Sequence, residues 1–161
     1  MVTRLVGRWE KVRSRRCKSG QIANTEPRPK ITCIISADGG KIGGVVDFLI
    51  DTGADHTVLM PDDASRLGIT STSLSQGCPD STRGVGGVTT PIRYLQDVTL
   101  EFQTSDPDKT ETVSLDRLGV IFPRRDARRG SGYSGMPSLL GRSFLSMCLI
   151  EMSPDKVVLS I

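Results

Sequence analysis

Short runs of β-favouring residues, each bounded by glycine, proline or aspartate turns, make up most of this 161-residue sequence. Thr32–Ser36 and the valine- and isoleucine-rich run Ile42–Ile50 flank a turn at residues 38–41 and predict a β-hairpin. Val98, Leu100 and Phe102 alternate with polar residues, as on a strand with one buried face. The other expected short strands are Thr57–Met60, the region of Val113 and Leu115, Val120–Phe122, and a final hairpin of Cys148–Met152 and Val157–Ile161.

Helical signals are few. Pro61-Asp62-Asp63 has proline in a first turn and acids near the positive end of the helix dipole, and Gly68 would end that helix. Arg142–Met147 predicts a second short helix, whereas residues 123–137 are rich in arginine, glycine and proline and predict a surface loop. The expected fold class is therefore all-β with one or two short helices.

The size and composition fit one ordinary globular domain. The chain is 37% hydrophobic, and it contains no apolar run near the ~18 residues that would span a bilayer. Residues 1–18 lack the apolar core of a signal peptide. With four dispersed cysteines and a single histidine, we expect free thiols, no metal site, no cofactor and no membrane contact. A reducing cytoplasm is the expected location.

Charge divides the chain into two parts. Residues 1–30 hold nine Lys and Arg with two Glu, whereas residues 31–161 hold twelve Lys and Arg with sixteen Asp and Glu. We expect residues 1–30 to be a basic, solvated and partly disordered arm, ending near Pro27 and Pro29, and residues 31–161 to be the domain. A nucleic-acid contact by this arm is the less favoured alternative.

Three motifs follow one another along the expected domain. The strand ending at Ile50 leads directly into Asp51-Thr52-Gly53-Ala54-Asp55. Gly84-Val85-Gly86-Gly87 suits the tip of a hairpin, and Leu139-Leu140-Gly141-Arg142 precedes the second helix. Taken singly, each has a plain structural interpretation, namely a polar turn, a glycine turn and a strand-to-helix junction.

Taken together, the three motifs resemble those of the retroviral-type aspartic proteases, or retropepsins, and their cellular and bacterial relatives. The run from Asp51 to Leu59 resembles that family's active-site loop, although His56 stands where retroviral members commonly have an acidic residue. The resemblance covers residues 31–161 and is weakest between Gln103 and Pro137. It implies a closed acid-protease barrel with one lobe per chain. The terminal hairpin is longer than in retroviral enzymes, so the dimer interface can differ from theirs.

Hydrolysis by an aspartic protease needs two carboxylates that share one proton. One acts as a base toward water and the other donates to the carbonyl oxygen of the peptide. This chain has a single Asp-Thr-Gly and is too short for a two-lobed enzyme. The second carboxylate is therefore expected from Asp51 of another copy, in a homodimer with the active site on its two-fold axis.

The resemblance also implies roles for other residues. Thr52 would hold the two loops together, Gly53 and Ala54 would contact substrate, and Asp55 would bind substrate main chain and pair with Arg142 beside Gly141. Gly84, Val85 and Gly86 would form a flap that closes over the substrate. Val58, Leu139 and Leu140 would line apolar pockets. The alternatives left open are a purely structural Asp55–Arg142 ion pair and core packing of the three apolar residues.

The sequence thus predicts a homodimeric aspartic endopeptidase that cleaves polypeptides with an Asp51/Asp51′ dyad. A different class of function also fits the same motifs, namely a catalytically silent module that uses this fold for dimerisation or peptide binding. Because a fold does not by itself imply an activity, the prediction depends on the site residues.

Overall fold

The structure is a computed structural model that describes residues 2–11, 26–74, 80–83, 89–122, 133 and 135–161. Its strands are β1 (Arg4–Glu10), β2 (Arg28–Ala37), β3 (Ile42–Ile50), β4 (Val58–Leu59), β5 (Asp80–Arg83), β6 (Thr89–Gln103), β7 (Thr110–Ile121), β8 (Ser138–Leu140), β9 (Leu149–Ser153) and β10 (Lys156–Ser160). Its helices are α1 (Pro61–Arg66) and α2 (Arg142–Leu145), with 3-10 turns η1 (Asp38–Gly40) and η2 (Ser71–Ser73).

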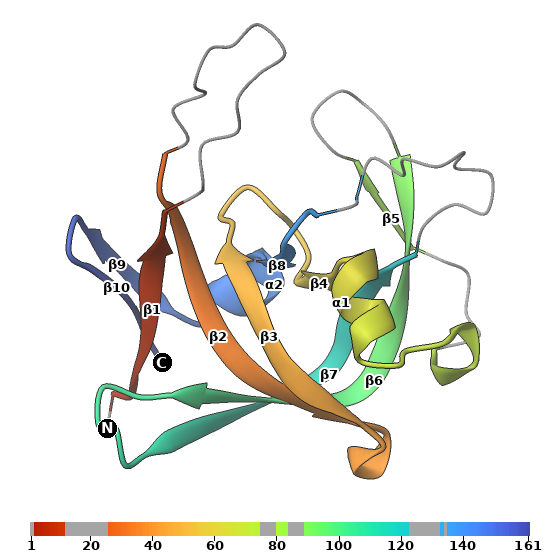
Figure 1. Ribbon diagram of the computed structural model, residues 1–161, viewed down its shortest axis with the longest axis horizontal. Coiled ribbons are helices and arrows are strands. Elements are labelled where there is room, and N and C mark those ends of the chain that lie inside the picture. The colour runs from red at the N-terminus through yellow and green to blue at the C-terminus, as the bar shows by residue number, and fades with distance from the viewer. Residues whose placement is uncertain (1, 12–25, 75–79, 84–88, 123–132, 134) are drawn as a thin grey trace, which may run out of the picture.

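Six of the described strands close into a barrel (Figure 1). The order is β2-β3-β8-β4-β7-β6, and β6 pairs back onto β2 through residues such as Phe102 opposite Cys33. Most neighbours are antiparallel, but β3 with β8 and β4 with β7 are parallel. β5 extends the sheet beyond β6, while β1, β10 and β9 extend it beyond β2. The predicted all-β class with two short helices is confirmed.

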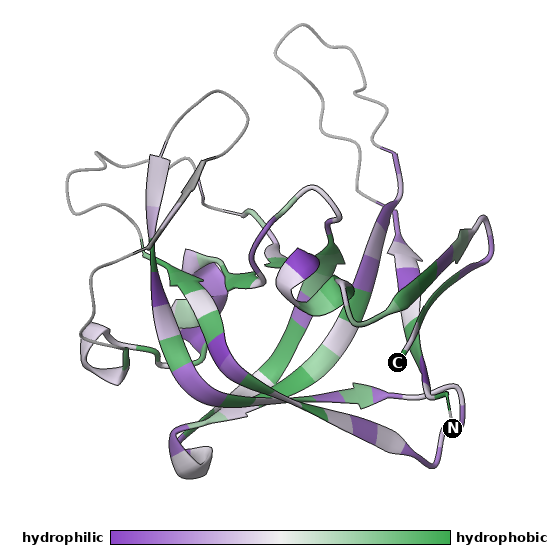
Figure 2. Ribbon diagram, turned by 180° about the vertical axis from the view of Figure 1, so that it is seen from behind, coloured by the Kyte–Doolittle hydropathy of each residue, from purple (hydrophilic) through white to green (hydrophobic). Residues whose placement is uncertain are grey.

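The barrel has one large apolar core and a smaller one. Alternation along the strands places Ile31, Val46, Phe48 and Leu100 inward, and Figure 2 shows hydrophobic and hydrophilic residues alternating in bands along the ribbon. Phe144 of α2 packs against Phe102 in this core, with 5.4 Å between the ring centroids. The smaller cluster lies between β4, β6 and β7 and consists of Val58, Met60, Ile92, Tyr94 and Ile121.

Two short strands that the sequence predicts are joined into one strand in the structure. β7 is one continuous strand over Thr110–Ile121 rather than two short ones. Its polar residues Asp116 and Arg117 are exposed and interrupt the apolar pattern, but Arg117 still pairs with Gln96 of β6. Backbone pairing therefore continues through a segment where the side-chain pattern stops. The helix at Pro61 forms as predicted, and Gly68 follows it with a φ of 69°.

The N-terminal arm contributes a strand to the sheet, which the sequence did not lead us to expect. Residues 4–7 pair with β10 and residues 8–10 pair with β2. Gly7 lies at the crossing point, where an added Cβ would be 2.7 Å from the Lys30 carbonyl oxygen. The Trp9 indole N–H donates to the Ser153 carbonyl at 2.7 Å. Residues 4–10 therefore belong to the sheet, and residues 12–25 of the expected arm lie outside the described residues.

An ion pair also fastens β1 to the barrel. The Arg8 guanidinium contacts the Asp47 carboxylate at 2.7 Å, and Arg8 and Asp47 both hydrogen-bond to Thr32. Burial raises the pKa of Asp47, but the hydrogen bonds from Thr32 and Arg8 and the nearby positive charges lower it further, so the net pKa lies below its usual range. This carboxylate therefore stabilises the fold above the pKa of the unfolded chain and loses that effect only in acid.

The placement of β1 makes a prediction about stability. Leu5 is fully buried in the large core, whereas its neighbour Val6 is 44% exposed. Leu5→Ala should lower the free energy of unfolding by about 2–5 kcal/mol, because a buried side chain is lost and a cavity remains. Val6→Ala on the same strand should cost less than about 1 kcal/mol. Urea denaturation of both variants checks this, and equal effects would mean that β1 does not pack on the barrel.

Candidate active site

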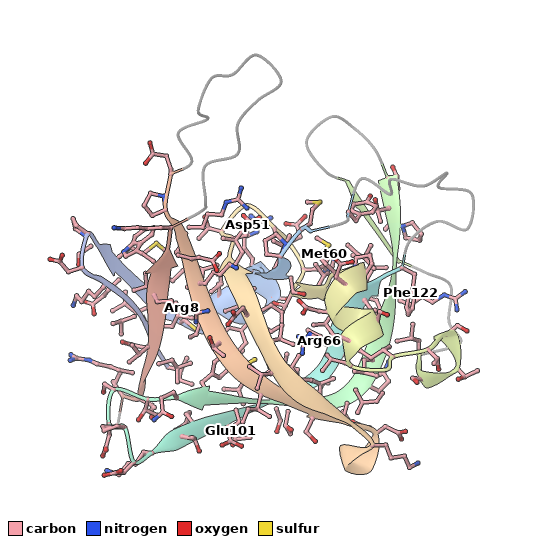
Figure 3. The ribbon with its side chains drawn as sticks, viewed as in Figure 1. Arg8, Asp51, Met60, Arg66, Glu101 and Phe122 are labelled. Atoms are coloured by element: carbon pink, nitrogen blue, oxygen red, sulfur yellow. The ribbon has the colours of Figure 1, made fainter. Side chains whose placement is uncertain are left out.

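Asp51 lies directly after β3, where that strand leaves the barrel beside β8 (Figure 3). β3 and β8 run parallel, with Ile50 opposite Leu140. The backbone N–H of Asp51 donates to the Leu140 carbonyl at 3.1 Å. The position of Asp51 therefore depends on β8, although the two segments are far apart in sequence.

The loop after β3 turns back on the Asp51 carboxylate. The Gly53 N–H donates to Asp51 Oδ1 at 2.9 Å, and the Ala54 N–H donates to the Asp51 carbonyl at 3.2 Å. Thr52 and Gly53 are exposed, and Asp51 is half-buried. The loop therefore fixes the orientation of an accessible carboxylate with a backbone donor.

The start of α2 also hydrogen-bonds to this loop. The backbone N–H groups of Arg142 and Ser143 donate to the carbonyls of Ala54 and Asp55, at 2.8 and 3.0 Å. The first N–H groups of a helix have no partners within the helix, so this contact satisfies both segments. The loop after β3 and α2 thus form one hydrogen-bonded unit.

Two hydroxyls that the sequence analysis did not single out strengthen this unit. The Thr57 N–H donates to Ser143 Oγ at 2.9 Å, and Ser143 Oγ is 3.1 Å from Thr57 Oγ1. The Gly141 N–H also donates to Thr57 Oγ1, at 3.1 Å. Thr57 is 4% exposed, and these contacts supply the hydrogen bonds that its buried hydroxyl needs. The sequence signal was a Thr in an otherwise apolar run and a Ser in the first turn of a helix.

Gly141 is the point of closest approach between the loop and the junction of β8 with α2. An added Cβ there would lie 2.4 Å from the His56 carbonyl oxygen and 2.9 Å from that of Ala54. Its φ of −96° is ordinary, so the requirement for glycine is one of space rather than of backbone conformation. This explains why an apolar pair followed by glycine precedes the helix.

Asp55 and Arg142 form the ion pair that the resemblance implied. The two side chains are 64% and 62% exposed. An ion pair this exposed contributes little to stability, because water solvates both charges. Their accessibility leaves both groups available to a bound molecule.

The apolar residues of the predicted site differ in burial. Leu140 is fully buried in the large core, in agreement with the core-packing alternative and not with a substrate pocket. Val58 is 3% exposed in the smaller cluster, and Leu139 is half-buried against that cluster. Leu139 is therefore the most accessible of the three. Gly84, Val85 and Gly86 of the predicted flap lie outside the described residues, between β5 and β6.

Other residues that could carry chemistry are His56 and two cysteines. The His56 ring contacts the Tyr94 ring edge-on, with 6.5 Å between the ring centroids. The Arg117 guanidinium lies over the same Tyr94 ring, 4.3 Å from its centroid. Cys33 and Cys148 are free thiols, and burial raises their pKa values to about 12 and about 11. Within the described part of the chain, no group of three or more His, Cys, Asp or Glu side chains is placed to hold a metal ion.

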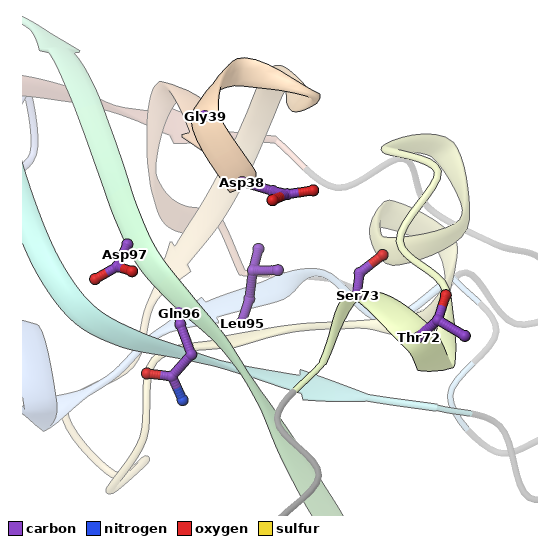
Figure 4. Close-up of a pocket in the computed structure, with 7 residues that line it drawn as sticks. All are labelled: Asp38, Gly39, Thr72, Ser73, Leu95, Gln96 and Asp97. Carbon is purple, nitrogen blue, oxygen red and sulfur yellow. The ribbon is translucent and has the colours of Figure 1, made fainter.

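A polar pocket of about 300 Å³ lies at the other end of β3 from Asp51 (Figure 4). Its lining residues come from η1, η2 and β6 and are Asp38, Gly39, Thr72, Ser73, Leu95, Gln96 and Asp97. Since η1 precedes β3 and Asp51 follows it, the nine-residue strand separates this pocket from the candidate site.

Among the described helices, none is both long and apolar enough to cross a bilayer.

Comparison with known proteins identifies the family. A family model described as aspartyl protease matches residues 39–144. No curated protein matches the chain in sequence. Among solved structures, the chain is similar to a retropepsin-like aspartic protease from Rickettsia conorii, with 18% identity, 99% of this chain and 92% of that chain covered, and a TM-score of 0.46.

The family match includes both the Asp51 loop and the start of α2. Because it spans about two thirds of the chain, the chain belongs to the aspartyl protease family. The predicted closed barrel with two short helices is confirmed among the described residues.

Proposed function

We propose that this chain is an aspartic endopeptidase that hydrolyses peptide bonds with Asp51. The observation that carries the proposal is the accessible Asp51 carboxylate, which accepts the Gly53 N–H at 2.9 Å in a loop fixed by both β8 and α2. A catalytic carboxylate must be held in place before substrate binds, since small displacements cost much of the rate. The membership of the aspartyl protease family supports the same chemistry.

The proposed active unit is a homodimer. The sequence contains one Asp-Thr-Gly, so a single chain supplies one carboxylate of the two that the reaction needs. In the dimer, one Asp51 takes a proton from water while the other donates a proton to the peptide carbonyl oxygen. The water oxygen bonds to the carbonyl carbon, which becomes tetrahedral. The carbon–nitrogen bond then breaks, the nitrogen takes the proton that came from water, and a hydroxyl of the intermediate returns a proton to the other Asp51. Two like charges so close together cannot both ionise readily, so the pair holds one proton between them.

Other residues of the loop have proposed roles in binding. Thr52 would hold the two copies of the loop together, and Gly53 and Ala54 would contact the substrate backbone. The exposed pair Asp55 and Arg142 would bind substrate main chain, since both charged groups are accessible. Leu139 and Val58 would form the apolar wall beside them, and residues 84–86 would close as the flap.

The shared dyad can be tested by mixing two forms of the chain. Asp51→Asn subunits should form mixed dimers with wild-type subunits, and a mixed dimer lacks one carboxylate. After subunit exchange at equal amounts, activity should fall to about half of that given by the same amount of wild type alone. With a ninefold excess of Asp51→Asn, activity should fall to about a tenth of that given by the same amount of wild type alone, because only about a tenth of the wild-type subunits still pair with each other. The measurement is cleavage of a denatured protein mixture.

The controls separate the alternatives. Light scattering must show that each preparation is a dimer and that the mixture has exchanged. Unchanged activity in an exchanged mixture would mean that one chain carries a complete site. Wild-type chain that is dimeric and still cleaves nothing would favour the catalytically silent dimerisation or peptide-binding module.

A further inference from the structure

The first turn of α1 carries two carboxylates that contact the segment leading into β8. Asp62 Oδ2 accepts the Gly135 N–H at 2.8 Å, and Asp63 Oδ2 accepts the Ser138 hydroxyl at 2.6 Å. Ser138 is fully buried, and its Oγ also accepts the Met60 N–H at 3.0 Å. The Ser138 hydroxyl thus donates its single proton to Asp63 and accepts the N–H of Met60, the residue that caps α1.

Asp63 also reaches β3 through an arginine. Its Oδ1 lies 2.7 Å from Arg66 Nη2, and the same nitrogen donates to the Val45 carbonyl at 2.7 Å. Figure 3 shows Arg66 between α1 and the strand β3. The Asp63 side chain is 21% exposed, so water competes with these contacts only in part. One carboxylate therefore links α1, β8 and β3.

These contacts lie two residues from the anchor of Asp51. β8 has three residues, of which Ser138 pairs with Phe48 and Leu140 with Ile50. The Leu140 carbonyl then accepts the Asp51 N–H. Because β8 is so short, a contact at its first residue sets the position of its last one.

We infer that Asp63 is a positioning residue for Asp51: through Ser138 it fixes β8, and β8 fixes the backbone of the catalytic loop. The inference rests on the proposed function for its kinetic consequence, but its structural consequence can be measured without any activity. Removing the carboxylate leaves a buried hydroxyl without its acceptor, which favours movement of β8 rather than a local adjustment in water.

The structural test is amide hydrogen exchange. Asp63→Ala should speed exchange of the Asp51 and Leu140 amides by roughly tenfold, while amides of β9 and β10 keep their wild-type rates. Asp63→Asn keeps an oxygen that can accept the Ser138 hydroxyl and should restore slow exchange at Asp51. Asp155→Ala, which removes an exposed carboxylate from the turn between β9 and β10, is the matched control. Uniformly faster exchange across the barrel, or no change at Asp51, would overturn the inference.

The kinetic test separates positioning from general stability. In Asp63→Ala, kcat should fall about tenfold with KM little changed, because the loss is in placing the dyad rather than in binding substrate. Asp63→Asn should stay within about threefold of wild type. Ser138→Ala should lower kcat similarly, and combining it with Asp63→Ala should add little further loss. Additive losses, or a rise in KM alone, would contradict the proposed link.

The two proposals fail in different ways. If wild-type dimer cleaves nothing, the proposed function fails, and the exchange rate of the Asp51 amide still decides the role of Asp63. If wild type cleaves and Asp63→Ala behaves like Asp155→Ala in both assays, the positioning role fails alone.

Discussion

Replacing Asp51 with Asn is expected to lower peptide cleavage by at least about a thousandfold while the chain stays folded. Asn has nearly the same shape, and its side-chain oxygen can still accept the Gly53 N–H that holds the loop in the wild-type structure. It cannot act as a base toward water or share a proton with its counterpart in the proposed dimer. The fold depends on backbone contacts of residue 51, such as its N–H to the Leu140 carbonyl, and these remain.

Cleavage of a denatured protein mixture by wild type and Asp51→Asn measures this effect. Asp155→Asn serves as the control for loss of a negative charge, because Asp155 is an exposed carboxylate in the turn after β9. Thermal unfolding and light scattering should show the same fold and assembly for all three. Cleavage by Asp51→Asn at the wild-type rate would remove Asp51 from the mechanism.

The second large effect is expected at Gly141. An alanine there would place Cβ 2.4 Å from the His56 carbonyl oxygen, and this oxygen belongs to backbone that cannot rotate away. The loop from Ala54 to His56 must then move away from α2, which breaks the Arg142 N–H contact with Ala54. Gly141→Ala should lower the free energy of unfolding by about 3 kcal/mol. It should also abolish cleavage in chains that remain folded, because the Asp51 loop loses its support.

Urea denaturation and cleavage at low temperature separate the two consequences. Gly43→Ala is the matched control, because Gly43 is exposed on β3 and an added Cβ there would be 3.3 Å from the nearest atom, the Ile35 carbonyl oxygen of β2. It should cost less than about 1 kcal/mol and leave cleavage unchanged. If Gly141→Ala is as stable and as active as Gly43→Ala, the close approach of the two segments at Gly141 is not needed.

Local patterns predicted the elements that depend on neighbouring residues. The hairpin around the turn at residues 38–41, the start of α1 at Pro61 and the end of β3 at Ile50 follow from short-range signals. The placement of Asp51 after a strand was predicted for the same reason. Its orientation was not, because the groups that fix it, Leu140 and the start of α2, come from a distant part of the chain.

Long-range contacts account for what the sequence did not predict. Thr57 and Ser143 are 86 residues apart, so no local pattern pairs their hydroxyls. Leu140 is apolar whether it lines a pocket or fills the core, and its full burial decides for the core. The high charge of residues 1–30 concealed a strand whose apolar side chains are Leu5, Val6 and Trp9. Charged side chains on the outer face of a sheet do not prevent pairing of its backbone.

The place of β1 in the sheet has a consequence for how the protein is made. Leu5 pairs with Leu159, so β1 has its partner in a strand that is synthesised much later. Until β10 leaves the ribosome, β1 has one free edge, and Leu5 lacks the side chains that cover it. Native structure in this region is therefore reached only after β10 has been made, and Leu5 stays uncovered until then. A contact of such long range also predicts slow folding for this part of the barrel.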